Sequence, residues 1–400
     1  MNTVKRWNQQ RLLVMAGLLL VMVAAGCGPA PLGISWAGLT TFGDAQNLLV
    51  AFNDRLVMID PVEGKPIKLL NPSGEVRLDN EGKPRLWEVR AQNGPNQFFA
   101  APIPLDADTL LVATYNQVLH TVDVPTARIE NPEGSPIPGT TGHLVADLVS
   151  DGDLIFAGLS TKNVVALDRE DFRVQWTFPT GHGVWSQPLL QDGVLYFASL
   201  DHYLYAVSAK TGEQLWKLDL EGAAPSAPVY YNGRLFIGSF GRKIFEVSTD
   251  GQVLNTYKTL DWIWSKPTIV DDILFVGDLV GNVYALDTTR GLAEVWAQKV
   301  ASSAIRPAPV VYDNAVVVAS RDQKVYWLKR ADGSPIMDAE GRPLVREMQA
   351  PVFSDMLLIK PSEAVKLAEP ILVVSTLAPN QLLVAYTVSE ARFLWAYALQ

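Results

Sequence analysis

Short apolar segments alternate with turn-forming residues along most of the chain. The segments are rich in Val, Ile, Leu, Tyr and Phe, and Asp-Gly, Asn-Gly or Thr-Gly pairs separate them. Such pairs supply the positive φ angles that tight β-hairpins require. No segment shows helical periodicity at a usable length. The pattern therefore predicts an all-β fold.

The apolar segments recur in units of about forty residues, the period of a repeat architecture. Residues 186–216 resemble residues 226–257 and 265–296. Within 186–216 we expect four antiparallel strands, at about 188–190, 194–199, 204–208 and 214–218. A proline opens successive units, at Pro188, Pro228, Pro267, Pro309 and Pro351.

More divergent units occupy 47–61, 101–123 and 146–176, and a last one follows Pro351. Eight units of four strands predict an eight-bladed β-propeller, in which each sheet buries both faces against its neighbours. Seven blades would result if the first and last units formed one sheet closed by the N-terminal strand. Either ring is a single domain rather than the two or three that 400 residues allow.

The first segment has the features of a signal peptide. Lys5, Arg6 and Arg11 precede an apolar run over 12–25 that ends at Cys27. The small residues before this cysteine resemble a bacterial lipobox, which implies a lipid on Cys27. An uncleaved membrane anchor and an ordinary secretory signal are the alternatives. We expect a lipoprotein signal peptide at 1–26, a lipidated cysteine and short tether at 27–35, and one propeller at 36–400.

Composition and charge exclude several functions. The chain is 48% hydrophobic and 19% charged, so it can bury a large core. Its formal charge of -9 disfavours nucleic acid, which requires a surplus of Lys and Arg. Because Cys27 is the only cysteine, the chain holds no intrachain disulfide and no thiolate zinc site.

Several motifs resemble those of the PQQ-like, quinoprotein-type repeat family. The opening proline, the Asp-Gly turn, Tyr-Ala-Leu at 284–286 and the Thr-Gly turn at 211–212 fit this family, as do the closing tryptophans Trp176, Trp216 and Trp296. In the family the closing tryptophan packs between adjacent blades. Tyr257 and Asp338 interrupt the tryptophan series, so we expect weaker blade contacts there.

The same resemblance guides the functional expectation. Quinoprotein dehydrogenases use an adjacent cysteine pair and an Asp base beside calcium, so we expect this chain to be no enzyme and to bind no cofactor. Architecture, length and lipidation resemble the lipoprotein propeller subunit of the outer-membrane β-barrel assembly machinery. This implies a non-enzymatic, lipid-anchored and monomeric scaffold that holds protein partners outside the cytoplasm. We expect the protein to be located at the cell membrane or, in a diderm cell, at the periplasmic face of the outer membrane. Gly28 after the cysteine resembles the sorting signal for the outer membrane.

Candidate chemistry is sparse. His120, His143, His182 and His202 lack the spacing of a local metal site, and no nucleophile or phosphate-loop motif occurs. We therefore expect no metal and no catalytic group. A PQQ-dependent enzyme is the least favoured alternative.

One unusual group lies three residues before the opening position of successive units. Its members are Phe99, Leu144, Trp185, Pro225, Trp264, Arg306 and Met348. If first strands line the channel, Trp185, Trp264 and Arg306, with Phe99, Trp262 and His182, form an aromatic and cationic rim. Such a rim suits a surface receptor for glycan or peptide. The alternative is that both tryptophans plug the channel or pad blade contacts.

Overall fold

The computed structural model describes residues 38–91, 97–98 and 100–399. The described residues from 38 to 399 belong to one compact unit. The expected signal peptide and tether, Cys27 and the candidate rim residue Phe99 lie outside the described residues.

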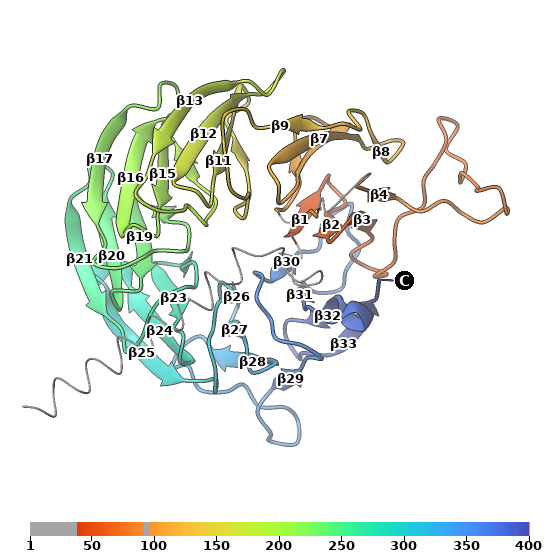
Figure 1. The fold of residues 1–400 in the computed structure, drawn as a ribbon. Helices are drawn as coiled ribbons and strands as arrows, with labels where there is room; N and C mark the ends of the chain where they lie inside the picture. Colours follow the sequence, from red (N-terminus) through yellow and green to blue (C-terminus); the bar gives the residue numbers. More distant parts are fainter. Residues whose placement is uncertain (1–37, 92–96, 99, 400) are drawn as a thin grey trace, which may run out of the picture. The chain divides into compact units, whose positions relative to one another are not determined.

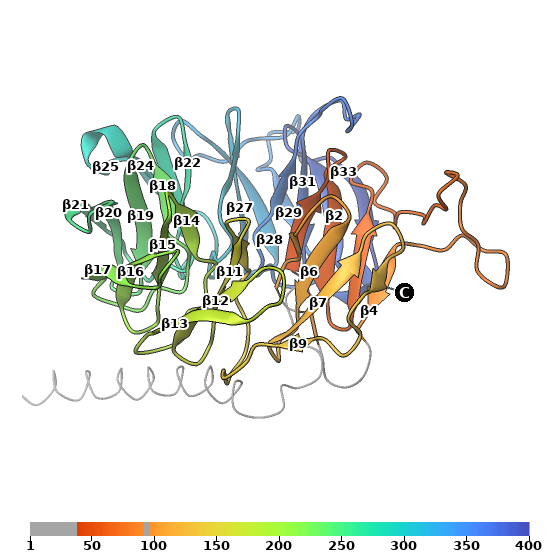
Figure 2. The ribbon, with the colours of Figure 1, turned by 90° about the horizontal axis from the view of Figure 1, so that it is seen from above.

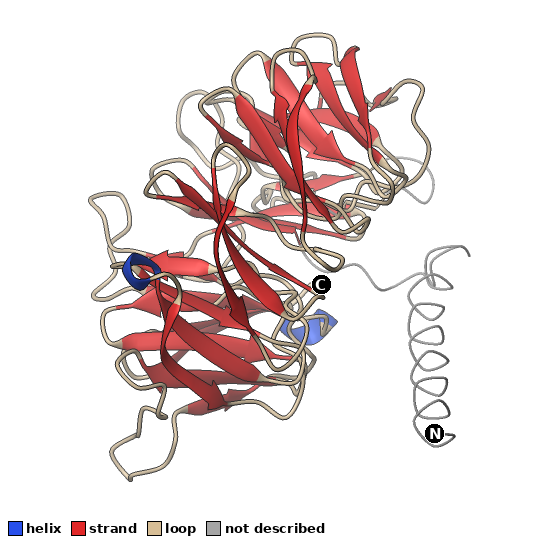
Figure 3. Cartoon of the chain, turned by 90° about the vertical axis from the view of Figure 1, so that its left-hand side faces the viewer, coloured by secondary structure: helices blue, strands red, loops and turns tan. Residues whose placement is uncertain are grey.

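Eight separate antiparallel sheets form a ring (Figure 1). The first sheet contains β1–β4 and the last contains β30–β33, and neither takes a strand from the other. This confirms the eight-bladed propeller and excludes the seven-bladed alternative. Strands make up nearly all the regular structure, with two short 3-10 helices (Figure 3).

The first four blades are built from consecutive strands. Blade 1 contains β1 (Gly38–Phe42), β2 (Asn47–Phe52), β3 (Arg55–Ile59) and β4 (Glu88–Arg90). Blade 2 contains β5 (Ile103–Pro104), β6 (Thr109–Ala113), β7 (Val118–Asp123), β8 (Arg128–Ile129) and β9 (Ser135–Pro136). Blade 3 contains β10 (Val149–Ser150), β11 (Leu154–Gly158), β12 (Asn163–Asp168) and β13 (Val174–Pro179). Blade 4 contains β14 (Leu189–Gln191), β15 (Val194–Ala198), β16 (Tyr203–Ser208) and β17 (Gln214–Asp219).

The remaining blades follow the same order. Blade 5 contains β18 (Val229–Tyr231), β19 (Arg234–Ser239), β20 (Lys243–Ser248) and β21 (Val253–Lys258). Blade 6 contains β22 (Thr268–Val270), β23 (Ile273–Gly277), β24 (Asn282–Asp287), η1 (Thr288–Arg290) and β25 (Ala293–Lys299). Blade 7 contains β26 (Val310–Tyr312), β27 (Ala315–Ser320), β28 (Lys324–Lys329) and β29 (Val345–Glu347). Blade 8 contains β30 (Leu357–Ile359), β31 (Ile371–Ser375), η2 (Pro379–Gln381), β32 (Leu383–Thr387) and β33 (Phe393–Tyr397).

The turns form where the sequence predicts them. Asp192 and Gly193 have φ angles of 51° and 75°, and they join β14 to β15 as a tight hairpin. Asn232 and Gly233 do the same between β18 and β19. The four strands predicted in 186–216 are β14–β17, with boundaries that differ by one residue at most.

The first strand of each blade faces the ring axis and the fourth faces outward (Figures 1 and 2). First strands of neighbouring blades, such as β10, β14 and β18, lie next to one another. The second and third strands are buried along almost their whole length, whereas β17 and β21 alternate between exposed and half-buried residues. Apolar side chains on both faces of each sheet therefore form the core between blades.

Tryptophans join adjacent blades through a repeated contact. The indole Nε1 of Trp176 donates to the carbonyl of Ala209, that of Trp216 to Thr249 and that of Trp296 to Arg330, at 2.8–2.9 Å. Each carbonyl belongs to the next blade. The glycine of the following turn lies against the indole, and a Cβ on Gly212 would come within 2.7 Å of Trp176.

Two further tryptophans change the expectation for blades 7 and 8. Trp327, on the third strand of blade 7, is fully buried and donates to the carbonyl of Val388 in blade 8 at 2.9 Å. Blade 7 therefore docks through its third strand, although Asp338 interrupts the series on the fourth. Trp395 donates to the carbonyl of Pro61 at 3.0 Å and so joins blade 8 to blade 1.

An arm projects from blade 1 between β3 and β4, over residues 60–87 (Figure 1). Three backbone hydrogen bonds run in a cycle at its centre, from Arg77 N to Leu69 O, from Leu69 N to Arg85 O and from Arg85 N to Arg77 O. A second cycle at the base joins Met58, Ile67 and Trp87. The arm is thus made of two consecutive three-way junctions of short hairpins.

Candidate binding site at one mouth of the ring

Two sets of loop residues from successive blades approach one mouth of the ring. The first set lies four residues before the first strand of a blade and contains Trp185, Pro225, Trp264, Arg306 and Phe353. The second set begins the turn between the second and third strands and contains Tyr115, Leu200, Phe240, Leu279 and Arg321.

A repeated hydrogen bond holds the two sets together. The backbone N–H of each turn residue donates to a carbonyl in the loop that leads from the preceding blade into its own blade. The pairs are Tyr115 to Gln97, Leu200 to Gly183, Phe240 to Ala223, Leu279 to Trp262 and Arg321 to Ala304, at 2.8–3.0 Å. Because the backbone repeats this contact, the side chains at these positions are free to vary and to set the chemistry of the mouth.

Aromatic rings from blades 4 to 6 lie close together at the mouth. The centroids of Trp185 in blade 4 and Trp264 in blade 6 lie 6.3 Å apart at an angle of 48°. Blade 5 has the buried Pro225 at the equivalent position, so no third ring from this set stands between the two indoles in sequence order. Phe240 stacks on Trp262 at 4.9 Å and lies 5.7 Å from Trp264. The three tryptophans predicted for the rim are therefore together.

Two arginines complete this group. The guanidinium of Arg306 lies 4.0 Å from the ring centroid of Trp264 and 5.5 Å from that of Phe353. Arg321 lies 5.4 Å from the Phe353 ring. Burial, and then the positive charge of Arg321, lower the pKa of Arg306 to about 10. We name Trp185, Phe240, Trp264, Arg306, Arg321 and Phe353 the mouth cluster.

His182, of the predicted rim, and three other residues singled out in the sequence lie outside this group of ring contacts. His182 is exposed, its Nδ1 accepts a hydrogen bond from Gly183 N, and it takes part in no ring contact within the described part of the chain. Leu144 and Met348 are buried in the cores between blades. His143 stacks on Tyr115 at 3.9 Å, and burial lowers its pKa.

Sequence reasoning missed Phe240, Arg321 and Phe353. Phe240 and Arg321 were detectable, because each follows a buried serine at the end of a second strand, Ser239 and Ser320. Phe353 was missed because Pro351 is not equivalent to the other opening prolines, since β30 starts six residues after it.

Acidic and basic side chains also lie deeper on the inner wall. Asp147 and Asp355 occupy equivalent positions, two residues before β10 and β30, and each accepts a 2.7 Å hydrogen bond from the preceding blade, from Ala101 N and Ala308 N. Burial among protein atoms raises the pKa of both carboxyls, although Asp355 keeps contact with solvent. Lys266 opposes this rise at both sites.

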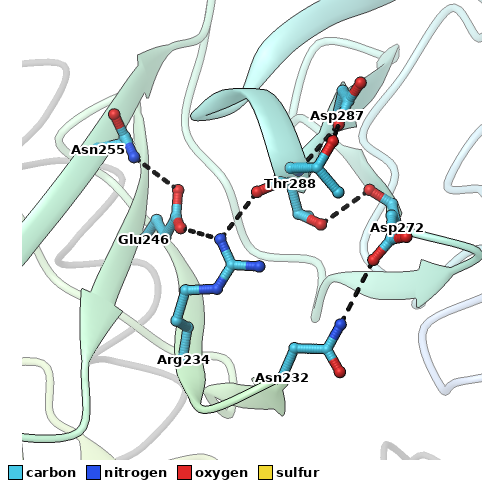
Figure 4. A network of polar contacts seen from close by, with 8 residues as sticks. Asn232, Arg234, Glu246, Asn255, Asp272, Asp287 and Thr288 are labelled. Carbon is cyan, nitrogen blue, oxygen red and sulfur yellow. Dashed lines mark hydrogen bonds and ion pairs between the residues drawn. The ribbon is translucent and has the colours of Figure 1, made fainter.

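Figure 4 shows the ion pair between Arg234 and Glu246 within a network of polar contacts. Glu246 is 1% exposed and accepts from Arg234 and from Asn255 Nδ2. Arg234 also donates to the carbonyl of Thr288 in blade 6 at 2.8 Å. Since every charged group here has partners, the network joins blades 5 and 6 and offers no free acid or base.

Metal-binding clusters and membrane-spanning helices are both absent from the described residues. No group of three or more His, Cys, Asp and Glu side chains is arranged to hold a metal ion in this part of the chain. The same residues include no helix that has the length and apolarity to cross a bilayer. An open cleft of about 420 Å³ between β4 and β8 contains Glu88 and Arg90, which pair with each other at 2.6 Å.

The fold and these repeats define an eight-bladed propeller of PQQ-like units. A family model described as outer membrane protein assembly factor BamB matches residues 130–261 and 258–336, slightly more than half of the chain. The chain belongs to this family.

Individual relatives are distant. The BamB of Yersinia pestis is 23% identical over 233 residues, which are 54% of this chain and 58% of the relative. The quinoprotein alcohol dehydrogenase PedH of Pseudomonas putida is 28% identical over 147 residues, 30% of this chain and 25% of that enzyme. The chain thus spans less than two thirds of the length of these curated relatives. The crystal structure of BamB from Moraxella catarrhalis has a TM-score of 0.58 at 14% identity, covering 88% of this chain and 96% of that one, and supports the fold.

Proposed function

We propose that this protein is a lipid-anchored, non-enzymatic scaffold that acts outside the cytoplasm in the assembly of outer-membrane proteins. Membership of the BamB family is the observation that carries the proposal. The dehydrogenase match supports shared repeats rather than shared chemistry, because it covers only 25% of that enzyme. A scaffold needs exposed surfaces rather than a reactive group.

The proposed domain organisation follows the sequence. A signal peptide ends at residue 26, Cys27 carries the lipid, 27–35 form the tether and 36–400 form the propeller. A compact unit over Trp36–Gln400 supports the last boundary. The acidic chain would be repelled by an anionic lipid surface, so attachment depends on the lipid.

The anchor has a direct test. Cys27→Ser should move the protein from the membrane fraction to the soluble fraction, because a single residue holds the lipid. Fractionation at low and high salt, followed by immunoblotting, measures this shift. Retention of the variant on membranes at high salt would contradict the lipid anchor.

The arm of blade 1 offers a surface for a protein partner. Its bridge pairs, Leu70 with Val76, Leu78 with Pro84 and Lys68 with Leu86, set these side chains on one side of the hairpins. Leu70 is 50% exposed, Leu78 56% and Leu86 44%. Exposed apolar side chains grouped in this way are typical of protein interfaces.

We expect the double variant Leu70→Ser/Leu78→Ser to lose partner proteins in crosslinking and co-purification from cell envelopes. Each removed leucine should weaken binding by about 1–2 kcal/mol, since it buries apolar area in the complex. Leu215→Ser is the matched control, because Leu215 is 54% exposed on the outer strand β17. Equal recovery of partners by all three proteins would overturn the role of the arm.

The second candidate function is a surface receptor that binds glycan or peptide at the mouth cluster. The meeting of Trp185, Trp264 and Arg306 favours it. A glycan array and a peptide array separate the two functions, because a scaffold that works through its arm requires no ligand at the mouth.

A further inference from the structure

Arg306 and Arg321 stand in the mouth cluster without counter-ions. Among residues 38–91, 97–98 and 100–399, no carboxylate forms an ion pair or hydrogen bond with either guanidinium. The nearest acidic residue in sequence, Asp322, accepts instead from Ser302 N and the hydroxyl of Tyr326. Two like charges close together, one of them largely buried, are costly to keep unpaired.

The surroundings of Arg306 hold its guanidinium in place without satisfying it. The faces of Trp264 and Phe353 lie against the cation, which partly offsets its lost hydration. Its Nε is buried and has no hydrogen-bond acceptor within the described structure. Stacking fixes the plane of a guanidinium and leaves its N–H groups to act at the edge, where a carboxylate binds in bidentate fashion.

The mouth therefore presents cationic donors and aromatic faces, and neither guanidinium is paired with an acceptor among the described residues. A ligand that complements it must carry an anionic acceptor. It must also have an elongated body that fits against Trp185, Phe240 and Trp264. A peptide with carboxylate groups meets both needs, whereas a neutral glycan leaves the two positive charges unpaired.

We propose that the mouth cluster binds an acidic segment of a polypeptide, with a carboxylate held between Arg306 and Arg321. The carboxylate is an Asp or Glu side chain or a chain terminus, because the two present the same chemistry. The mouth cluster is separate from the arm and from the lipid on Cys27. The peptide-binding proposal can therefore be disproved while the scaffold role stands, and the scaffold role can be disproved while peptide binding stands.

The test is isothermal titration calorimetry of the full-length protein in detergent with three hexapeptides. The first contains Glu with both termini capped, the second is its capped Gln analogue, and the third is the Gln peptide with a free C-terminal carboxylate. We expect the first or third to bind at least about tenfold more tightly than the second, and which of them binds identifies the source of the carboxylate.

Variants connect this binding to the two arginines. Arg306→Gln and Arg321→Gln should each weaken peptide binding about tenfold or more and reduce its salt dependence. Arg342→Gln is the matched control, since Arg342 is exposed in the same blade and already pairs with Asp338 and Glu340. Arg321 is exposed, so Arg321→Gln keeps the test valid if Arg306→Gln fails to fold.

Three results would overturn the proposal. The first is equal affinity for the Glu and Gln peptides or no binding of either. The second is unchanged binding by both arginine variants. The third is inorganic phosphate, or a glycan from an array, binding as tightly as the peptides with the same loss in the variants.

Discussion

The inner-wall carboxyl of Asp147 shows how one residue couples the ring to pH. Burial raises the pKa of this carboxyl above its ordinary value of 3.8, and the charge of Asp355 adds a smaller rise. The folded state therefore binds a proton more tightly than the unfolded chain. At neutral pH the ionised Asp147 carboxylate therefore destabilises the folded state. This penalty shrinks, and the free energy of unfolding rises, as the pH falls from above the raised pKa towards 3.8.

Asp147→Asn should thus make the protein more stable at pH 7 and weaken the rise in stability on acidification. The amide oxygen still accepts from Ala101 N, so the hydrogen bond between blades 2 and 3 remains. Urea unfolding at pH 7 and pH 4.5 measures both effects, with Asp151→Asn on an exposed turn as control. A variant with the same pH dependence as the natural protein would contradict the assigned cause.

At the residue scale, the sequence predicted the mouth only where the repeat kept its period. Trp185, Trp264 and Arg306 lie at equivalent distances before first strands, so counting residues found them. Phe353 required the start of β30, which the irregular segment after Pro351 conceals. The role of His182 stays a prediction, because its exposed side chain makes no ring contact within the described residues and its position in the sequence does not fix its direction.

At the scale of elements, one four-residue motif recurs in hairpins that are added to the basic four strands of blades 1, 2 and 7. An acidic residue, a glycine, a Lys, Ser or Arg, and a proline recur together, at 63–66, 81–84, 133–136, 332–335 and 340–343. Every such glycine has a φ angle between 68° and 77°, and every such proline pairs across its hairpin. A proline fits there because the opposite residue requires no donated N–H. The forty-residue period does not reveal this motif, because the motif is much shorter than a blade and is inserted within blades.

The outer part of the arm, residues 70–84, should fold independently of the ring. Its central hydrogen-bond cycle joins Leu69, Arg77 and Arg85 to one another and to no other blade. Replacing residues 70–84 with Asn-Gly keeps the pair of Leu69 and Arg85 as a two-residue hairpin.

We expect this truncation to change the free energy of unfolding by less than about 1 kcal/mol and to abolish the partner binding that depends on Leu70 and Leu78. Urea unfolding and co-purification test the two parts. A loss of several kcal/mol would show that the arm supports the ring.

At the scale of the whole molecule, eight complete sheets close a ring without sharing a strand. Propellers that interlock first and last strands close by backbone pairing, whereas here closure relies on side chains. Apolar residues of β2, β3, β31 and β32 form one core, and Trp395 reaches Pro61. The repeat period predicted one ring, but it left seven and eight blades open because blade 1 lacks the opening motif and contains the arm.

Trp395→Ala should destabilise the protein by about 3–5 kcal/mol, since it empties a large buried volume at the closing contact. Trp296→Ala, at an internal contact with similar burial, is the control. We expect only the Trp395 variant to speed hydrogen exchange in β2 and β31, because blades 6 and 7 stay joined by a short connection. Equal exchange in the two variants would contradict closure through Trp395.

Closure through side chains also sets the order of folding. The contact between Trp395 and Pro61 spans 334 residues, while that between Trp176 and Ala209 spans 33. A tenfold longer loop costs about 2 kcal/mol more in chain entropy, so the contact between blades 8 and 1 should form last. Before this contact forms, the sheets of blades 1 and 8 each expose an apolar face to solvent. An unclosed ring should therefore be prone to aggregation and should be recognised by chaperones.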